Sequence, residues 1–296
     1  MTLDSAQLAA LAAVVQHGSF ERAARTLHVT PSAISQRIAR LEDRLGLVLV
    51  TRGAPCRATP AGDRLARHAE AVALAEHDTL AALGVADSED ALPVVRVAVN
   101  ADSLATWFVD ALAGLESMRV DVVVDNEEHS IGWLRRGEVM AAVAVDGETV
   151  GGCDRRSLGR LRYRATASPQ FVARYFPDGV TPQALAAAPA LSFNAADRLQ
   201  ARWAGRYVGP VEPGSGHCLP SANAFVDAAE AGIGWGLNPA PLIAQALAER
   251  RLVELLPDTP FDVPLAWHYV RRLDAVLGPL TEAVATAAGR HLVAPD

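Results

Sequence analysis

The 296-residue chain contains no lysine, so all 27 of its basic residues are arginine, and it contains only three cysteines. Cys56, Cys153 and Cys218 lie far apart and form neither a CxxC pair nor a His/Cys cluster with the spacing of metal ligands. This pattern argues against a metal site and against a disulfide framework. We interpret the three cysteines as reduced thiols.

Long apolar runs are also missing, and none reaches the roughly 18 residues that a membrane span requires. The N-terminal stretch MTLDSAQLAALAAVVQHG has no basic region ahead of its apolar residues, which is typical of a helix and not of a signal peptide. We therefore expect a cytoplasmic protein with no membrane partner. Half of the residues are hydrophobic, which is enough for a sizeable core in two or three domains.

The sequence shows no constellation of catalytic groups. Its eight histidines form no HExxH or similar pair. The segment PGSGH contains Ser215 and His217, but Pro213 breaks the GxSxG pattern of a nucleophile elbow. The segment GIGWG follows a helical pattern and lacks the full dinucleotide fingerprint. We therefore expect no enzyme, no catalytic residue and no cofactor.

Charge is distributed unevenly along the chain, whose net charge is −7. Residues 1–70 hold nine arginines against six acidic residues, a balance of +3. Residues 71–296 hold 18 arginines against 28 acidic residues, a balance of −10. A basic N-terminal segment on an acidic body is the charge pattern expected of a nucleic-acid-binding module attached to a second domain.

The first 90 residues are mostly helical by pattern, with clear helix ends. Gly18 ends a first helix, and Ser19 is the N-cap of a short second helix. Thr30 caps a third helix with Pro31 at its first position, and Gly46 ends it. Two short runs rich in Val and Thr then flank RGAPCR, which predicts a β-hairpin. A long Ala/Leu-rich helix follows, capped by a threonine before a proline in ATPAG.

The third helix has an unusual polar face. Its apolar face comprises Ile34, Ile38, Leu41 and Leu45. The remaining surface and the N-cap carry Thr30, Ser32, Ser35, Gln36, Arg37 and Arg40. Hydroxyl, amide and guanidinium groups read base edges and phosphates in a major groove. Three helices and a wing hairpin bearing Arg52 and Arg57 match helix-turn-helix geometry. The alternative is a solvated helix that happens to lack Glu and Lys.

The segment SFERAARTLHVTPSAISQRIARLEDRLGLVLVTR, followed by ATPAG, resembles the winged helix-turn-helix of LysR-type transcriptional regulators. It has the Ala-Ala pair, the Ser/Thr-rich entry to the recognition helix and the RLE…LG exit of that family. Many members carry Gln-Pro where this chain has Pro31-Ser32. A glutamine that could contact a base is thus missing, and Ser32 and Gln36 are expected to carry more of the sequence readout.

After the polar segment VADSEDALP the pattern of apolar residues changes from mostly helical to alternating strand and helix. The β-branched runs VVRVAV, VDVVVD and MAAVAV alternate with helical segments, which predicts an α/β domain with a largely parallel sheet. In such sheets ligands bind at the carboxyl ends of the strands. A helix N-terminus with Ser103 and Thr106 could hold a carboxylate there, and Asp125, Glu127 and Asp146 could meet a cation. The alternatives are helix capping by Asp102 or Ser103 and solvated acidic loops.

The segments NADSLATW, RRGEVMAAVAV, ARYFPDGVT and AFVDAAEAGIGWG are similar to the arginine- and lysine-responsive branch of the same family, whose members regulate basic amino acid export. The resemblance implies an effector site at Ser103, Thr106, Asp146, Asn194, Ser221 and His268. Asp146 and Glu127 are the candidates for the cationic end of lysine or arginine. Alternatives are a LysR-type regulator with another small carboxylate effector and, more remotely, a solute-binding protein.

The resemblance also implies a domain plan. We expect a winged helix-turn-helix at residues 1–60 and a linker or dimerisation helix with a hinge at 60–90. Residues 91–296 are expected to form a periplasmic-binding-protein-like α/β effector domain. Its subdomains are 91–163 with 269–296, and 164–268. The resemblance further implies an activator that binds double-stranded DNA, a homodimer or tetramer, and contact with RNA polymerase.

Overall fold

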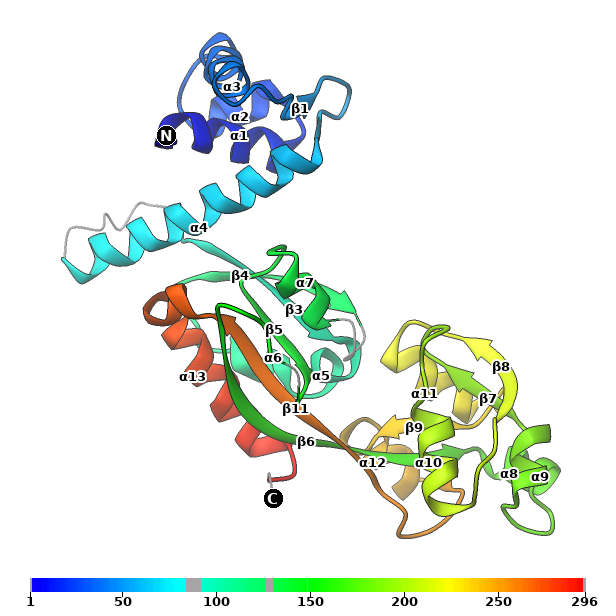
Figure 1. Ribbon diagram of the computed structural model, residues 1–296. Helices are drawn as coiled ribbons and strands as arrows, with labels where there is room; N and C mark the ends of the chain where they lie inside the picture. The colour runs from blue at the N-terminus through cyan, green and yellow to red at the C-terminus, as the bar shows by residue number, and fades with distance from the viewer. Residues whose placement is uncertain (1, 84–91, 126–129, 148, 295–296) are drawn as a thin grey trace.

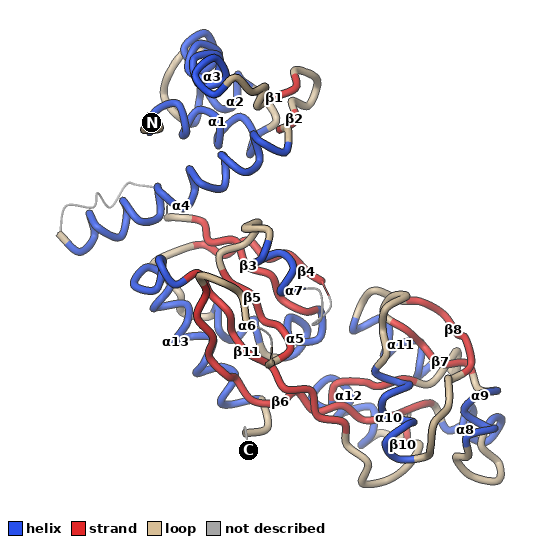
Figure 2. Tube along the Cα trace, in the orientation of Figure 1, coloured by secondary structure: helices blue, strands red, loops and turns tan. Residues whose placement is uncertain are grey.

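The computed structural model describes residues 2–83, 92–125, 130–147 and 149–294. A small helical module at the N-terminus is followed by the long helix α4 (Pro60–Ala82) and by a larger α/β body (Figure 1). The body consists of two subdomains joined by the long strands β6 (Cys153–Ala167) and β11 (Phe261–Val270), as Figure 2 shows. Within the described residues, no helix has the length and apolar character needed to cross a membrane.

The N-terminal module forms where the sequence places its helix ends. It contains α1 (Ser5–His17), α2 (Phe20–Thr26), α3 (Pro31–Leu45) and the antiparallel hairpin β1 (Val50–Thr51) with β2 (Arg57–Ala58). Gly18 and Gly46 end α1 and α3 in the left-handed conformation, and Ser19 and Thr30 cap the helices that follow. These helix-end signals each lie within a few residues of the end that they mark, which is why the module could be predicted from the sequence.

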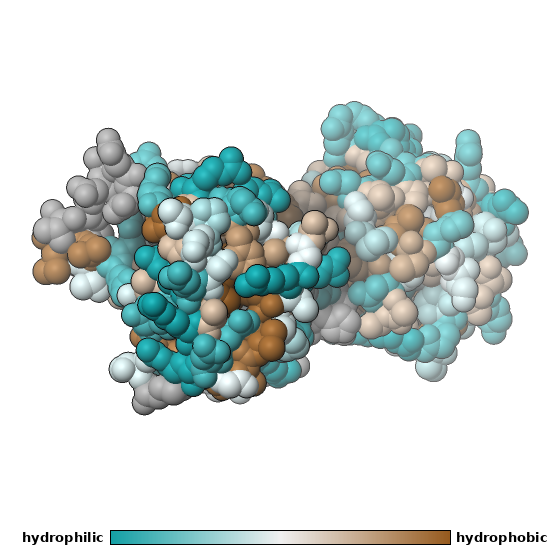
Figure 3. All heavy atoms as spheres, turned by 90° about the horizontal axis from the view of Figure 1, so that it is seen from above, coloured by the Kyte–Doolittle hydropathy of each residue, from teal (hydrophilic) through white to brown (hydrophobic). Residues whose placement is uncertain are grey.

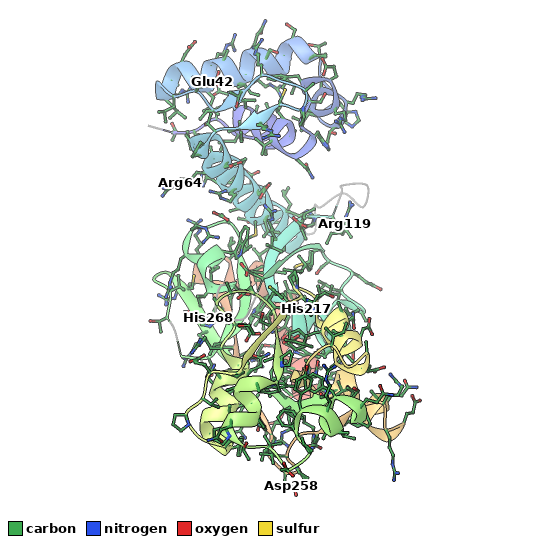
Figure 4. The ribbon with its side chains drawn as sticks, turned by 90° about the vertical axis from the view of Figure 1, so that its right-hand side faces the viewer. Glu42, Arg64, Arg119, His217, Asp258 and His268 are labelled. Carbon is green, nitrogen blue, oxygen red and sulfur yellow. The ribbon has the colours of Figure 1, made fainter. Side chains whose placement is uncertain are left out.

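Glu42 of α3, which is labelled in Figure 4, holds the start of the hairpin to the helices. One carboxylate oxygen of Glu42 accepts hydrogen bonds from the backbone N–H groups of Leu49 (2.7 Å) and Val50 (3.3 Å). On the other side, a Cβ at Gly62 would lie 2.0 Å from the carbonyl oxygen of Leu49, so only glycine lets α4 approach this strand. Glu42 and Gly62 thus fix the position of the hairpin.

Helix α4 joins two hydrophobic cores. Ala69 is buried in the core of the N-terminal module, whereas Leu74, five residues later, is buried in the core of the α/β body. Figure 2 shows α4 as one uninterrupted helix across this junction. Its far end is apolar and exposed, since Leu80 and Leu83 are 44% and 69% accessible, and brown spheres mark this end in Figure 3.

The first subdomain contains β3, β4 and β5 with helices on both faces. Its elements are β3 (Val94–Asn100), α5 (Ala101–Thr106), α6 (Phe108–Leu112), β4 (Arg119–Asp125), α7 (Ser130–Arg135), β5 (Ala141–Val145), η1 (Arg271–Leu273) and α13 (Asp274–His291). Trp107, Phe108 and Trp267 are fully buried where α6 and α13 pack on the sheet. The β-branched strand residues and these aromatic rings form the core.

The second subdomain inserts between β6 and β11. It contains α8 (Pro169–Tyr175), α9 (Pro182–Ala187), β7 (Pro189–Ser192), α10 (Leu199–Tyr207), β8 (Gly214–Cys218), α11 (Ala222–Glu230), β9 (Gly236–Pro239), α12 (Ala240–Ala248) and β10 (Val253–Glu254). Trp203 and Trp235 pack together at its centre with ring centroids 5.6 Å apart. The chain therefore crosses between the subdomains twice.

These two crossings correct the expectation of a largely parallel sheet. The strand order is β10-β6-β11-β5-β3-β4, with β9 also paired to β6. The pairs β3–β4 and β3–β5 are parallel, as the three apolar runs predicted. The pairs that β6 and β11 make are antiparallel, because the chain leaves the first subdomain along β6 and returns along β11.

Candidate nucleic-acid interface and ligand cavity

One surface of α3 is free of the module's core. Ile34, Ile38 and Leu41 are buried, whereas the predicted contact residues lie on the other side of the helix. Thr30, Ser32, Gln36 and Arg40 are exposed, and Ser35 and Arg37 are partly exposed. The Thr30 hydroxyl accepts the N–H of Ala33 at 3.2 Å, which fixes the start of the helix. The helix thus presents hydroxyl, amide and guanidinium groups to solvent along one face.

The hairpin adds two exposed arginines beside this face. The guanidinium of Arg52 lies 5.6 Å from the ring centre of Phe20, at the start of α2. Arg57 is exposed on β2. In the described part of the chain, no acidic side chain forms an ion pair with Arg37, Arg40, Arg52 or Arg57. Four cationic groups are therefore available to neutralise phosphates.

A cavity lies where α5 of the first subdomain meets the second subdomain. Its lining comprises Ala101, Asp102, Phe193, Ala196, Asp197, Arg198, Leu199, Gln200, Ala222, Phe225, Leu237, Asn238 and Pro239. Asp102 comes from α5, Asp197 from the loop that precedes α10, and Asn238 from β9. Ligand sites between two subdomains combine apolar walls with a few polar groups that fix orientation, as this lining does.

Asp102 is a buried carboxylate of the cavity whose pKa is raised. Its Oδ2 accepts a hydrogen bond of 2.7 Å from the hydroxyl of Tyr163 on β6. Burial raises the pKa of Asp102 to about 6, the Tyr163 hydrogen bond acts in the opposite direction, and the negative charge of Asp197 raises the pKa further. A carboxylate held in such a site binds a cation favourably, because the cation stabilises the charged form that burial disfavours.

Asp197 is the second acid of the cavity. Its two carboxylate oxygens accept the backbone N–H groups of Phe193 (2.9 Å) and Leu199 (3.0 Å), which holds the loop before α10 in shape. The neighbouring Arg198 donates to Glu212 at 2.6 Å and is largely exposed. Two carboxylates and one arginine therefore share the cavity wall, an arrangement that suits a ligand with more positive than negative charge.

Comparison with known proteins identifies the family. Residues 5–63 match the bacterial regulatory helix-turn-helix proteins of the lysR family, and residues 89–293 match the LysR substrate binding domain. The chain belongs to the LysR family of transcriptional regulators. The predicted winged helix-turn-helix, the predicted α/β effector domain and the predicted regulator class, which is not an enzyme class, are confirmed.

Three relatives are similar to this LysR-family chain over nearly its full length. HTH-type transcriptional regulator LysG of Mycobacterium tuberculosis is 43% identical over 97% of this chain and 94% of its own. The crystal structure of ArgP from the same organism superposes with a TM-score of 0.80, at 42% identity over 99% of this chain and 100% of that one. Full-length LysG from Corynebacterium glutamicum, solved with bound effector Arg, gives a TM-score of 0.67 at 35% identity over 98% and 100%.

The residues predicted from the sequence as effector contacts do not line the cavity of this LysR-family protein. The Thr106 hydroxyl donates to the backbone oxygen of Asp102 at 2.6 Å, within α5, and Ser103 is fully buried beside it. Asp146 already forms an ion pair of 2.8 Å with Arg155. Glu127 lies outside the described residues. The described residues among these predicted contacts therefore make other interactions or are buried, and none of them lines this cavity.

The other three predicted contacts have structural roles in this LysR-family protein. Oδ1 of Asn194 accepts the N–H of Ala196 at 2.8 Å in the loop that shapes the cavity wall. Ser221 is the N-cap of α11 and accepts the N–H of Ala224 at 3.3 Å. His268 is buried in β11, between the neighbouring strands β5 and β6. Asn194 and Ser221 adjoin the lining residues Phe193 and Ala222 in sequence, and none of the three lines the cavity.

The sequence analysis does not select the two carboxylates that line the cavity. Helix capping is one alternative that the sequence leaves open for Asp102, but the N-cap position of α5 is Asn100, whose side chain makes no capping bond, and Asp102 lies within the helix. The signal for Asp102 is its place directly after a buried strand, which fits a ligand contact as well as a cap. Tyr163 and Asp197 carry no comparable signal, because only the fold brings them to Asp102.

Proposed function

We propose that this protein is a DNA-binding transcriptional regulator whose effector is a basic amino acid, lysine or arginine, held between the two subdomains. The observation that carries the proposal is the pair of carboxylates, Asp102 and Asp197, in the cavity wall. The relative solved with bound effector Arg supports the same ligand class. A ligand with a small uncharged side chain would leave one of the two carboxylates without a cation.

Within the cavity we assign Asp102 to one cationic group of the effector and Asp197 to the other. Arg198 is the candidate for the α-carboxylate, since it lies on the same wall and its guanidinium forms paired hydrogen bonds with carboxylates. Arg198 would then exchange part of its contact with Glu212 for the ligand. This assignment replaces the effector site predicted from the sequence at Asp146 and Glu127.

On the DNA side we propose that Thr30, Ser32, Ser35, Gln36 and Arg37 contact the major groove. Arg40, Arg52 and Arg57 would contact backbone phosphates. The exposure of these side chains on one surface supports the assignment. The buried opposite face of α3 holds the helix against α1 and α2, so the reading face has a fixed orientation. Gln36 carries an amide, which can both donate to and accept from a base edge, and it is assigned the main role in base discrimination.

The proposed mechanism is a shift between two arrangements of the assembly. Effector binding would favour the closed arrangement of the two subdomains, because α5 carries Asp102 and the second subdomain carries Asp197. Helix α4 is packed in both the winged module and the body, so a change in the body changes where the winged module points. The shift occurs only to the extent that the effector binds one arrangement more tightly.

We further propose a homodimer or tetramer that contacts RNA polymerase, with activation of a basic amino acid exporter gene in the cytoplasm. Two exposed leucines, Leu80 in the last turn of α4 and Leu83 just after the helix, support pairing of two chains along α4. A two-fold dimer would match two half-sites of an operator.

The test is a DNA footprint on fragments that the purified full chain retains at low salt. We expect retention that falls steeply with rising salt, and a protected region that changes in length or in hypersensitive positions when arginine is added. An identical footprint with and without lysine or arginine would contradict the proposed effector response. Loss of all retention at low salt would contradict the DNA-binding assignment of α3.

A further inference from the structure

One polar group of the cavity wall lacks a hydrogen bond. Asn238 of β9 is fully buried, and its Nδ2 donates to the hydroxyl oxygen of Thr166 on β6 at 3.0 Å. Its Oδ1 is also buried and receives no hydrogen bond from the described residues. Buried carbonyl oxygens in proteins nearly always accept at least one hydrogen bond. The Oδ1 atom is therefore an acceptor suited to a donor that enters the cavity.

We infer that Asn238 is an effector-recognition residue and that Thr166 is its positioning residue. The Oδ1 atom accepts a hydrogen bond from an ammonium or guanidinium N–H of the bound amino acid. Thr166 does not line the cavity; it holds the amide by accepting the Nδ2–H, which directs Oδ1 toward the ligand. This inference rests on the proposed function, because the basic amino acid supplies the donor.

The orientation of the amide decides what Asn238 selects. With Nδ2 bound to Thr166, the cavity gains a neutral acceptor beside the carboxylates of Asp102 and Asp197, and all three groups accept hydrogen bonds from a cation. With the amide reversed, Thr166 would donate to Oδ1, and Nδ2 would offer its protons to the carboxylate of the ligand. The two orientations give opposite responses when the amide is replaced by a carboxylate.

A neutral acceptor would also let the cavity distinguish nitrogen cations from metal ions, which carboxylates alone do poorly. A carboxylate attracts any cation, including metal ions, through charge and with little directional preference. A fixed amide oxygen requires an N–H donor at one position, and its buried state makes a ligand without that donor bind less well. Asn238 therefore adds specificity for nitrogen cations to the charge of Asp102 and Asp197.

The experiment is calorimetric titration of the full chain and its variants with L-arginine and with L-lysine at pH 7.5. In Asn238→Leu the acceptor is lost, and we expect the Kd for arginine to rise about tenfold or more. In Asn238→Asp the acceptor is kept, and we expect arginine to bind at least as tightly as to the parent. Loss of binding in Asn238→Asp would overturn the inference, since it would mean that the amide donates to the ligand carboxylate.

The positioning role has its own test, which avoids the cavity. Thr166→Val keeps the shape of the side chain and removes the hydroxyl, so the Kd should rise several-fold, and Thr166→Ser should restore it. The matched control is Thr281→Val, because Thr281 is also buried and also accepts a side-chain N–H at 3.0 Å, from Trp267, away from the cavity. Equal effects of Thr166→Val and Thr281→Val would overturn the positioning role.

Comparing the titrations with lysine and with arginine identifies which ligand N–H donates to Oδ1 of Asn238. An equal loss for both ligands in Asn238→Leu assigns the donor to the α-ammonium, which they share, and an unequal loss assigns it to the side-chain cation, where they differ. Far-ultraviolet circular dichroism and the melting temperature of each variant establish that it is folded. If the parent bound arginine and Asn238→Leu bound it equally well, this inference alone would fail; if the parent bound neither ligand, the proposed function would fail with it.

Discussion

The hydroxyl of Tyr163 donates a hydrogen bond of 2.7 Å to Oδ2 of Asp102, and this bond connects the strand that leaves the first subdomain with the helix that begins the ligand cavity. Tyr163 is almost completely buried. The bond opposes the rise in the pKa of Asp102 that burial causes. It therefore keeps part of the Asp102 population charged at neutral pH and ready for a cation.

Removing this hydroxyl should weaken effector binding without unfolding the protein. In Tyr163→Phe the pKa of Asp102 should rise further above 6, so more of the cavity is protonated at pH 7, and the Kd for arginine should increase roughly three- to tenfold. Isothermal calorimetry measures this change. Tyr207→Phe is the matched control, because Tyr207 also donates at 2.7 Å, to the backbone oxygen of Pro260, outside the cavity. A similar loss in both variants would contradict the role of Tyr163.

Affinity for the effector should fall as the pH falls from 7.5 to 5. A cation binds the charged form of Asp102, whose pKa is about 6 in the free protein, so binding releases a proton. Between pH 7.5 and pH 5 the Kd should rise about tenfold, because only about a tenth of Asp102 is charged at pH 5. Titrations across this range in buffers of different ionisation enthalpy measure both the Kd and the released protons. A Kd that is constant from pH 5 to 7.5 would exclude Asp102 as the contact.

At neutral pH the charged Asp102 should lower the free energy of unfolding of the ligand-free protein. Its folded-state pKa of about 6 lies above the ordinary 3.8, so the folded chain holds the proton through this interval and loses stability as the pH rises through it. Asp102→Asn should thus raise the free energy of unfolding at pH 7.5 by about 1–3 kcal/mol and abolish arginine binding. Thermal melts at pH 4 and 7.5 measure the effect. Asp110→Asn, at an exposed carboxylate bound to His291, is the control and should show neither change.

The two DNA-contact surfaces should respond differently to substitution. Gln36→Ala should reduce discrimination between operator variants at one base pair by about 1–3 kcal/mol and leave non-specific binding intact. Arg57→Ala should weaken binding to all sequences and lower the slope of log affinity against log salt by about 1. Competition binding at several salt concentrations separates the two effects. Unchanged one-base discrimination in Gln36→Ala, or an unchanged slope in Arg57→Ala, would contradict the corresponding assignment.

The hairpin position should depend on Glu42. In Glu42→Ala the N–H groups of Leu49 and Val50 lose their acceptor, and the winged module should be destabilised by about 1–3 kcal/mol. Affinity for DNA should fall as well, because the hairpin that carries Arg52 and Arg57 is no longer held in position. Binding of the amino acid L-arginine in the cavity should be unchanged. Calorimetric melting with both binding assays checks this. Asp43→Ala, at the exposed neighbouring acid, serves as the control.

The winged module could be predicted from the sequence because its signals are local. Gly18, Ser19, Thr30 and Gly46 each mark a helix end within a few residues, and no distant contact is needed to interpret them. The cavity could be predicted only as a place, at the strand ends of the α/β body. Its carboxylates depend on packing between segments far apart in the chain, as Asp102 and Tyr163 illustrate.

The measurement that tests the account most directly is calorimetric titration of the full chain with lysine, arginine, ornithine, histidine and leucine at pH 7.5. We expect binding of lysine or arginine, with proton release, and none of leucine, because leucine lacks the second cation that Asp102 and Asp197 require. Binding of leucine as tight as that of arginine, or binding of none of the five amino acids, would contradict the assignment of this cavity to a basic amino acid.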